Sequence, residues 1–301
     1  MIVKHCQSLI RPRLSSIFPR NQVINCYSSF KPVDIEEIRT EFRAYGNGRI
    51  DFKTENNIGI IKLDYPEKKN AISGRMMSEF YDLMTNIEKG YYPMVKGLIL
   101  TAEGDFFCAG GDKEMVRKLT HLTSTEMAWK MTCLMHETVK KFYTIPALSV
   151  ALVNGRGLGG GAELCLATDL RIFAEKSGKL SFVQAKMGLM TGWAGGSRLY
   201  HLLGSRSKAL EILLSCRTIN SDEAMKLGLC DKIVPDDQDL LKETITWLEN
   251  LIQHDPLVIS SIKKSVTDEN CEKMFENERK LFAPLWSGPA NREALRKKLK
   301  F

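Results

Sequence analysis

A glycine-rich segment and the glutamate that follows it are the residues of this sequence best suited to chemistry. Gly155 to Gly161 holds five glycines and precedes Glu163, where an apolar run gives way to a helical pattern. The first N–H groups of a helix lack intrahelical acceptors and carry partial positive charge, so they can hold an oxygen that becomes negative during a reaction. A first-turn side chain leans toward the N-terminus, so Glu163 can reach what the segment binds. The alternative is a glutamate that only satisfies the helix start.

A second turn offers another free backbone donor. The stretch from Phe106 to Asp112 is interpreted as a strand end, a turn containing Ala109 and Gly110, and a helix that Asp112 can begin, which leaves the N–H of Gly111 free. Two backbone donors that converge on one oxygen form an oxyanion hole, and removing one such donor typically costs about 3 kcal/mol of transition-state stabilisation. The two turns together predict a reaction that passes through an oxyanion.

A third segment, Pro66 to Ala71, is a basic turn ahead of a helix. Its lysines suit the phosphates of a ligand, although a solvated surface turn is the more common outcome for such residues. The combination of the three segments, rather than any one of them, favours a functional interpretation.

Alternating strands and helices must position these turns. Short runs of aliphatic and β-branched residues predict strands, and helical spacing predicts one helix from Ser73 to Gly90 and another from the capping pair Thr123 and Glu126 to Pro146. Such alternation predicts an α/β domain with largely parallel pairing. The expected strands are Ile58 to Leu63, Val95 to Thr101, Ala147 to Val153 and Leu170 to Ala174.

The last third of the chain has a different character. No strong strand follows Lys232 to Val234, and the pattern predicts successive helices that pack on the core or on a neighbouring subunit. They are Lys208 to Leu214, Ser221 to Leu227, Asp239 to Ile252, Pro256 to Val266 and a final charged amphipathic stretch.

Composition excludes several classes of function. The formal charge is +7, but once five bases before Asp34 and five after Asn291 are set aside, 33 bases and 35 acids remain, so the body lacks the excess of a nucleic-acid-binding face. Eight cysteines form no C-x-x-C pair, no histidine stands at metal-ligand spacing, and no apolar run approaches the length of a membrane span. We expect buried thiols, no metal and no membrane partner.

The first 33 residues carry five bases, many serines and no acid. This composition is typical of a mitochondrial transit peptide, and a disordered basic tail is an equally good interpretation. The segment is set apart from the fold in either case.

Taken in order, the motifs resemble the enoyl-CoA hydratase/isomerase (crotonase) superfamily over roughly residues 50 to 300. The resemblance implies an α/β superhelix of repeated ββα units with a helical C-terminal oligomerisation region, forming a homotrimer or a dimer of trimers. It places an extension at 1–45, the core at 46–245 and the helical region at 246–301. The motifs are Asn70-Ala71, Ala109-Gly110-Gly111-Asp112, Gly159-Gly160-Gly161-Ala162-Glu163 and Arg217 to Val234.

The resemblance also implies a ligand and a set of site residues. The ligand is an acyl-CoA whose thioester oxygen lies between the N–H groups of Gly111 and Gly160, with Glu163 as the third catalytic residue and no cofactor beyond the coenzyme A of the substrate. Neither metal nor nucleic acid is expected. The substrate contacts implied are Lys68, Ala71, Ala109, Gly110, Gln184 and Trp193, with Phe282 and Lys297 as further CoA contacts.

Gln184 separates this chain from the hydratases of the superfamily. Those enzymes carry a second glutamate three residues before an aliphatic-glycine pair, and here the pair is Met187-Gly188, which puts Gln184 in that position. Adding water to a double bond needs a base and a proton source, and an amide supplies neither as a carboxyl does. The sequence therefore argues against ordinary hydration.

A finer resemblance points to a branch of the superfamily that decarboxylates malonyl-type CoA thioesters. It implies loss of CO2 from ethylmalonyl-CoA, and less well from methylmalonyl-CoA, as a cytosolic metabolite-repair reaction; the basic N-terminus suggests the mitochondrial matrix instead. Two alternatives stay open: a Δ3,Δ2-enoyl-CoA isomerase that uses Glu163 alone, and a noncatalytic CoA- or RNA-binding protein. The matching segments are Val150 to Glu163, the loop of Trp193, Ile262 to Val266, Asn277 to Arg279 and Trp286 to Asn291.

Overall fold

The computed structural model describes residues 33–93, 95–113, 115, 125–266, 271–286 and 288–297. Residues 34–301 form one compact unit, and everything below concerns that unit. The predicted helix start at Thr123 lies outside the described residues, as does most of the helix expected after Asp112.

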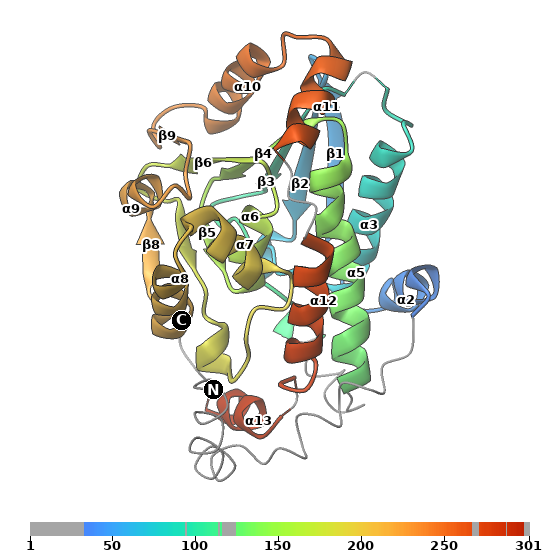
Figure 1. Cartoon of the computed structure of the whole chain (residues 1–301), viewed down its shortest axis with the longest axis vertical. Helices are drawn as coiled ribbons and strands as arrows, with labels where there is room; N and C mark the ends of the chain where they lie inside the picture. Colours follow the sequence, from blue (N-terminus) through green and yellow to red (C-terminus); the bar gives the residue numbers. More distant parts are fainter. Residues whose placement is uncertain are drawn as a thin grey trace, which may run out of the picture. The chain divides into compact units, whose positions relative to one another are not determined.

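A six-stranded sheet forms the centre of the fold (Figure 1). Its first two strands are antiparallel and all later neighbours are parallel, so the prediction of a largely parallel sheet is confirmed. The first strand was not predicted, because its residues are half-buried or exposed and rich in charge. In spatial order the strands are β1 (Arg49–Glu55), β2 (Ile58–Asp64), β3 (Gly97–Ala102), β4 (Leu148–Val153), β6 (Leu170–Ala174) and β9 (Lys232–Val234).

A small second sheet includes part of the glycine-rich segment. It consists of β5 (Arg156–Leu158), β7 (Lys179–Ser181) and β8 (Thr218–Asn220), with β5 and β7 parallel. Each strand has three residues, too short for an alternating pattern to reveal it. The strand β5 runs straight into α6 (Gly160–Cys165), so Glu163 does lie in the first turn of a helix, as predicted.

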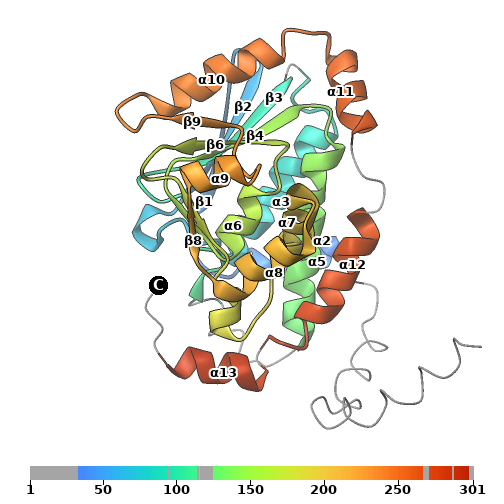
Figure 2. The same ribbon diagram turned by 60° about the vertical axis from the view of Figure 1, so that its left-hand side comes forward.

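Two long helices cover one side of the main sheet. The helices α3 (Gly74–Glu88) and α5 (Thr125–Thr144) lie side by side in Figures 1 and 2, and α2 (Ile35–Phe42) packs on both. The predicted start of α3 is confirmed, because the Ser73 hydroxyl accepts a hydrogen bond from Met76 N at 3.1 Å. Two single-turn 3-10 helices, η1 (Pro66–Lys68) and η2 (Gln184–Met187), follow β2 and β7 in the chain.

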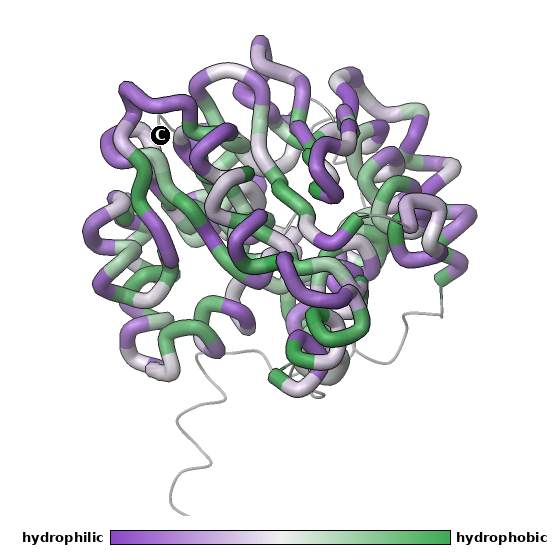
Figure 3. Tube along the Cα trace, turned by 90° about the horizontal axis from the view of Figure 1, so that it is seen from above, coloured by the Kyte–Doolittle hydropathy of each residue, from purple (hydrophilic) through white to green (hydrophobic). Residues whose placement is uncertain are grey.

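The predicted helix-rich C-terminal third is confirmed. Two of its helices, α10 and α11, pack against the main sheet, and Figure 3 shows the surrounding helices alternating between apolar and polar positions, as expected for helices with one buried face. None of the described helices is long and apolar enough to cross a membrane. The helices are α7 (Gly195–Leu203), α8 (Arg206–Ser215), α9 (Ser221–Lys226), α10 (Leu240–Leu251), α11 (Pro256–Ser265), α12 (Cys271–Phe282) and α13 (Pro289–Arg296).

The cysteines fit the expectation of buried thiols where the structure describes their side chains. Five are buried and form no disulfide, namely Cys108, Cys133, Cys165, Cys216 and Cys230. Among the described residues, no group of three or more His, Cys, Asp or Glu side chains is arranged to hold a metal ion.

Candidate active site

The two predicted turns meet in space. Cys108 N donates to Arg156 O at 3.1 Å and Leu158 N donates to Cys108 O at 2.8 Å, so the turn that ends at Gly111 lies along β5. On its other side, Ile72 N donates to Gly110 O at 2.7 Å. The turn is therefore held between the start of α3 and the start of α6.

Gly110 has a physical reason to be glycine. Its φ is +88°, and a Cβ there would lie 3.0 Å from Leu158 O and 3.1 Å from Gly160 N. A larger residue would push the two turns apart.

Two backbone donors are left free where the turns meet. Gly160 is the first residue of α6, and Gly159 before it provides no side-chain cap. Within the described part of the chain, neither Gly111 N nor Gly160 N has a hydrogen-bond acceptor. The arrangement is suited to holding one ligand oxygen between two N–H groups.

A cavity of about 250 Å³ opens at these donors. Of the predicted site residues, Ala109, Gly110, Gly111, Gly160, Glu163, Gln184, Trp193 and Phe282 line it, whereas Lys68, Ala71 and Lys297 do not. Lys69 lines it instead, from the same turn as Lys68. The far wall comes from α12 and α13, and Asn291 Nδ2 of α13 donates to Met187 O at 2.7 Å, which ties this wall to η2.

The Trp193 ring covers the two glycines. A Cβ added to Gly160 would lie 2.4 Å from the ring, and one added to Gly111 would lie 3.8 Å from it. The Trp193 side chain is 4% exposed. The indole therefore forms an apolar lid on the donors, and it keeps water from competing for their hydrogen bonds.

Replacing Gly160 with alanine should displace this ring. No Cβ fits 2.4 Å from a ring atom, and the expected result is a loss of about 100-fold in kcat/KM, because the lid and the donor beneath it both shift. Steady-state kinetics beside circular dichroism measures this. Gly204→Ala serves as a control for backbone strain without a steric clash, since its φ is +57° but a Cβ there meets nothing within 4 Å. Normal activity of Gly160→Ala would show that the ring does not have to stay in place.

Glu163 is buried, and both of its oxygens are fully used. Oε1 accepts from Gln184 Nε2 at 2.7 Å and from Gly192 N at 3.3 Å, while Oε2 accepts from Trp193 N at 2.7 Å and from Gly195 N at 2.8 Å. Burial raises the pKa of Glu163, and these hydrogen bonds oppose the rise by stabilising the carboxylate. The side chain faces the cavity, but its lone pairs are directed at the protein.

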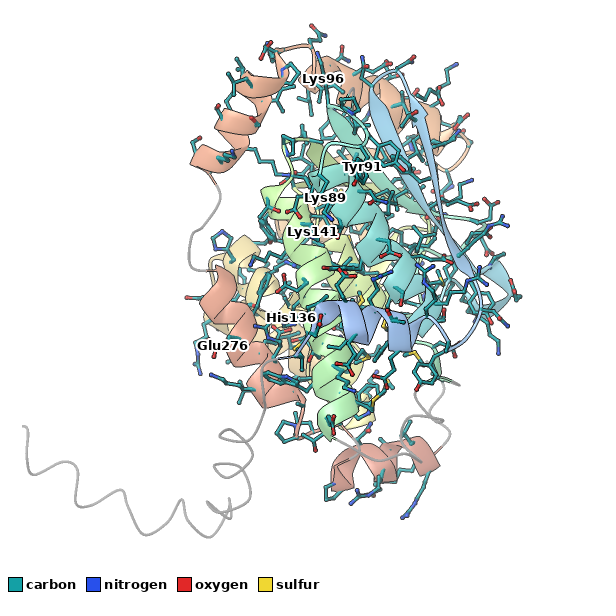
Figure 4. The ribbon with its side chains drawn as sticks, turned by 90° about the vertical axis from the view of Figure 1, so that its right-hand side faces the viewer. Lys89, Tyr91, Lys96, His136, Lys141 and Glu276 are labelled. Atoms are coloured by element: carbon teal, nitrogen blue, oxygen red, sulfur yellow. The ribbon has the colours of Figure 1, made fainter. Side chains whose placement is uncertain are left out.

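The residues from Thr191 to Ser197, here called the Trp193 turn, are held from several helices. His136 of α5, which Figure 4 shows beside α12, lies with Nε2 3.0 Å from Gly192 O. Burial lowers the pKa of His136 well below its usual value, so the ring is neutral and Nε2–H donates to this oxygen. Arg198 Nη1 donates to Trp193 O at 3.3 Å.

Sequence reasoning missed three residues around the site: His136, Glu278 and Asn70. Glu278 lies on α12 with 5% of its surface exposed, and Oε2 accepts from the Ser197 hydroxyl at 3.0 Å. A single glutamate in a charged amphipathic helix carries no signal of burial. Asn70 was noticed only as part of a motif, although its positive φ of +52° is a conformation in which asparagine is enriched.

Comparison with known proteins identifies the family. The sequence profile described as enoyl-CoA hydratase/isomerase matches residues 53–299. The chain belongs to this family.

Among solved structures, an enoyl-CoA hydratase from Bacillus halodurans superposes with a TM-score of 0.73 at 24% identity, covering 82% of this chain and 98% of that one. An enoyl-CoA hydratase/isomerase from Mycobacterium paratuberculosis gives a TM-score of 0.74 at 21% identity, covering 82% and 97%. The expected crotonase fold is confirmed.

Relatives with higher sequence identity share one stated activity. An ethylmalonyl-CoA decarboxylase from Bos taurus is 35% identical over 284 residues, covering 92% of this chain and 90% of the relative. One from Mus musculus is 36% identical over 281 residues, covering 91% and 85%. This chain is thus a crotonase-family acyl-CoA enzyme, and the cavity beside Gly111 and Gly160 is its candidate active site.

Proposed function

We propose that this crotonase decarboxylates ethylmalonyl-CoA, and methylmalonyl-CoA less well, as a metabolite-repair reaction. The observation that carries the proposal is the pair of free N–H groups at Gly111 and Gly160 beneath an apolar lid, with no free carboxylate among the described residues that line the cavity. The similarity to ethylmalonyl-CoA decarboxylases from two mammals supports it.

Decarboxylation suits such a site because the thioester itself accepts the electrons. When the bond between the α-carbon and the carboxylate breaks, its electron pair moves into the thioester carbonyl and CO2 leaves. The resulting enolate oxygen is held by Gly111 N–H and Gly160 N–H, which bind the charged form more strongly than the ground-state carbonyl. The carbonyl then re-forms as the α-carbon takes a proton from water, which leaves hydroxide.

Glu163 acts in this proposal by orienting groups rather than by donating a proton. Its carboxylate accepts four hydrogen bonds, so it has no proton to give. The same four donors reduce the negative charge that the substrate carboxylate would meet. Glu163 thereby fixes the Trp193 turn, and Gln184 completes its set of donors.

The isomerase alternative requires Glu163 to act as a base and an acid. Moving a proton between two carbons of an enoyl-CoA requires a carboxylate that is free to take and return it. Breaking hydrogen bonds from Gly195 and Trp193 for each transfer would add to the barrier. The geometry therefore favours decarboxylation.

The basic turn is proposed to hold the coenzyme A end of the ligand. Lys69 lines the cavity, and Lys68 stands next to it in the same turn, so both are proposed as phosphate contacts. Ala71 lies behind them, buried, and Ala109 and Gly110 offer backbone atoms along the cavity. A homotrimer or a dimer of trimers remains part of the proposal, and sedimentation equilibrium of the purified chain would test it.

The activity is tested by incubating the protein separately with ethylmalonyl-CoA, methylmalonyl-CoA and a 3-enoyl-CoA. Mass spectrometry should show loss of CO2 from the two malonyl-type thioesters, with ethylmalonyl-CoA faster, and chromatography should show the 3-enoyl-CoA unchanged. A shifted double bond at unchanged mass would instead make the protein an isomerase. Inertness toward all three would favour a binding protein, and salt-dependent RNA binding would then be the next assay.

A further inference from the structure

The helix α7 begins without a cap of its own. Its N-cap residue, Ala194, has a left-handed backbone with φ of +63° and no side-chain hydrogen bond. The first N–H groups of a helix need acceptors when they are buried. Here they are supplied from elsewhere, and the way they are supplied connects α12 to the active site.

Three side chains each accept one of these N–H groups. Gly195 N donates to Glu163 at 2.8 Å, and Gly196 N donates to the Thr191 hydroxyl at 3.1 Å. Ser197 N donates to Glu278 Oε2 at 3.3 Å, and the Ser197 hydroxyl donates to the same oxygen at 3.0 Å. The start of α7 is thus fixed between α6 on one side and α12 on the other.

Glu278 differs from Glu163 in how its charge is balanced. Its Oε2 accepts only from Ser197, and its Oε1 has no hydrogen-bond partner among the described residues. Burial, with the negative charge of Glu163 as the second cause, raises the pKa of Glu278 to about 8. Because four donors stabilise the carboxylate of Glu163, a proton taken up by the pair goes to Glu278.

The surroundings of Glu278 are mostly apolar. It lines a second cavity of about 470 Å³ together with leucines of α8 and α12, and Gln184 contributes to both this cavity and the active-site cavity. The charged groups that act on it are Glu163 from α6 and Arg198 from α7. Ionised Glu278 would therefore place a second negative charge beside that of Glu163.

We infer that Glu278 is a positioning residue for the proposed reaction: through Ser197 it holds the start of α7, and so keeps the Trp193 ring over the donors of Gly111 and Gly160. The path is short, since Trp193 is two residues before the first residue of α7. The neutral acid form of Glu278 holds Ser197 without repelling Glu163. The inference rests on the proposed function for its kinetic readout, but its structural readout does not need a substrate.

The experiment compares Glu278→Gln and Glu278→Ala with the exposed control Glu276→Gln, which lies on the same helix and forms an i,i+4 ion pair with Lys280. Figure 4 shows Glu276 on α12. Each purified protein is assayed for kcat and KM with ethylmalonyl-CoA between about pH 6 and 9.5, a range that spans the titration of an acid near neutrality. The indole emission of Trp193 is recorded without substrate, as the difference from the same protein carrying Trp193→Phe.

Expected results separate positioning from folding. Glu278→Ala should lower kcat by about 10- to 100-fold with a smaller change in KM, and should shift the Trp193 emission to the red, while remaining folded. Glu278→Gln, an isostere of the neutral acid, should restore most of kcat and abolish the decline of activity above about pH 8 that we expect of the unmodified protein. Glu276→Gln should behave as the unmodified protein.

Several outcomes would overturn the inference. These are an unchanged kcat and emission in Glu278→Ala, a loss of kcat that merely follows its unfolded fraction, or an alkaline decline that persists in Glu278→Gln. If the unmodified protein does not decarboxylate ethylmalonyl-CoA, the proposed function fails on its own. The emission of Trp193 and its pH dependence then still decide whether Glu278 positions the ring.

Discussion

Replacing Asn70 with alanine is expected to lower the free energy of unfolding by about 4 kcal/mol. Asn70 is fully buried, and its side chain bonds only to backbone: Oδ1 accepts from Tyr65 N at 2.8 Å, and Nδ2 donates to Glu103 O at 2.8 Å and Phe106 O at 2.6 Å. Alanine would leave these three groups without their partner, and each buried unsatisfied group costs about 1 to 3 kcal/mol. A non-glycine residue at φ of +52° adds strain that asparagine tolerates better than alanine does.

Chemical denaturation of the purified variants measures this effect. Asn70→Gly relieves the backbone strain while losing the same hydrogen bonds, so it should fall between the unmodified protein and Asn70→Ala. Asn70→Asp keeps the acceptor but sets a buried carboxylate oxygen against the carbonyls of Glu103 and Phe106, so it should destabilise the fold at least as much as Asn70→Ala. A loss below about 1 kcal/mol in Asn70→Ala would mean that water replaces the amide in the turn.

The second large effect concerns Glu163→Gln, which should reduce kcat/KM by about 100-fold or more and the free energy of unfolding by about 3 kcal/mol. In place of Oε2 the amide NH2 would confront the N–H groups of Trp193 and Gly195. In place of Oε1 it would confront Gly192 N, even if Gln184 turns its own amide oxygen toward it. The change therefore opens the Trp193 turn, although glutamine matches glutamate in size. The prediction is opposite to that for Glu278→Gln, where the amide replaces an already neutral acid.

Kinetics with ethylmalonyl-CoA and denaturation of the same samples test this contrast. Glu175→Gln provides a matched control, because Glu175 is exposed and does not line the cavity. Decarboxylation at the unmodified rate in Glu163→Gln would remove Glu163 from the mechanism, both as a proton donor and as an anchor.

Much of the scaffold is predictable from local sequence. Buried parallel strands such as Leu170–Ala174 are continuous apolar runs, and the hydroxyl of Ser73 marks the start of α3 directly. The two free N–H groups also follow from local rules, since Gly160 opens a helix and Gly111 ends a turn. What could not be read locally is β1, whose polar, half-exposed residues look like loop.

The hydrogen-bond partners of the site residues could not be predicted from the sequence. Glu163 lies 32 residues from Gly195, Glu278 lies 81 residues from Ser197, and His136 lies 56 residues from Gly192. Sequence reasoning placed the Glu163 carboxyl at the site but had no means of knowing that backbone donors occupy it. Lys68 was expected from the resemblance, whereas the turn at η1 decides that its neighbour Lys69 lines the cavity.

The atoms proposed to hold the oxyanion belong to the main chain, and this has a consequence for inheritance. A missense mutation exchanges side chains, so no codon change other than one to proline can delete the N–H of Gly111 or Gly160. Harmful alleles are expected instead at neighbours that shape the turns, such as Gly110, where any Cβ collides with backbone atoms. Substitutions that accumulate in such a gene can change the side chains that line the cavity, and with them the reaction, while the N–H groups of Gly111 and Gly160 stay in place.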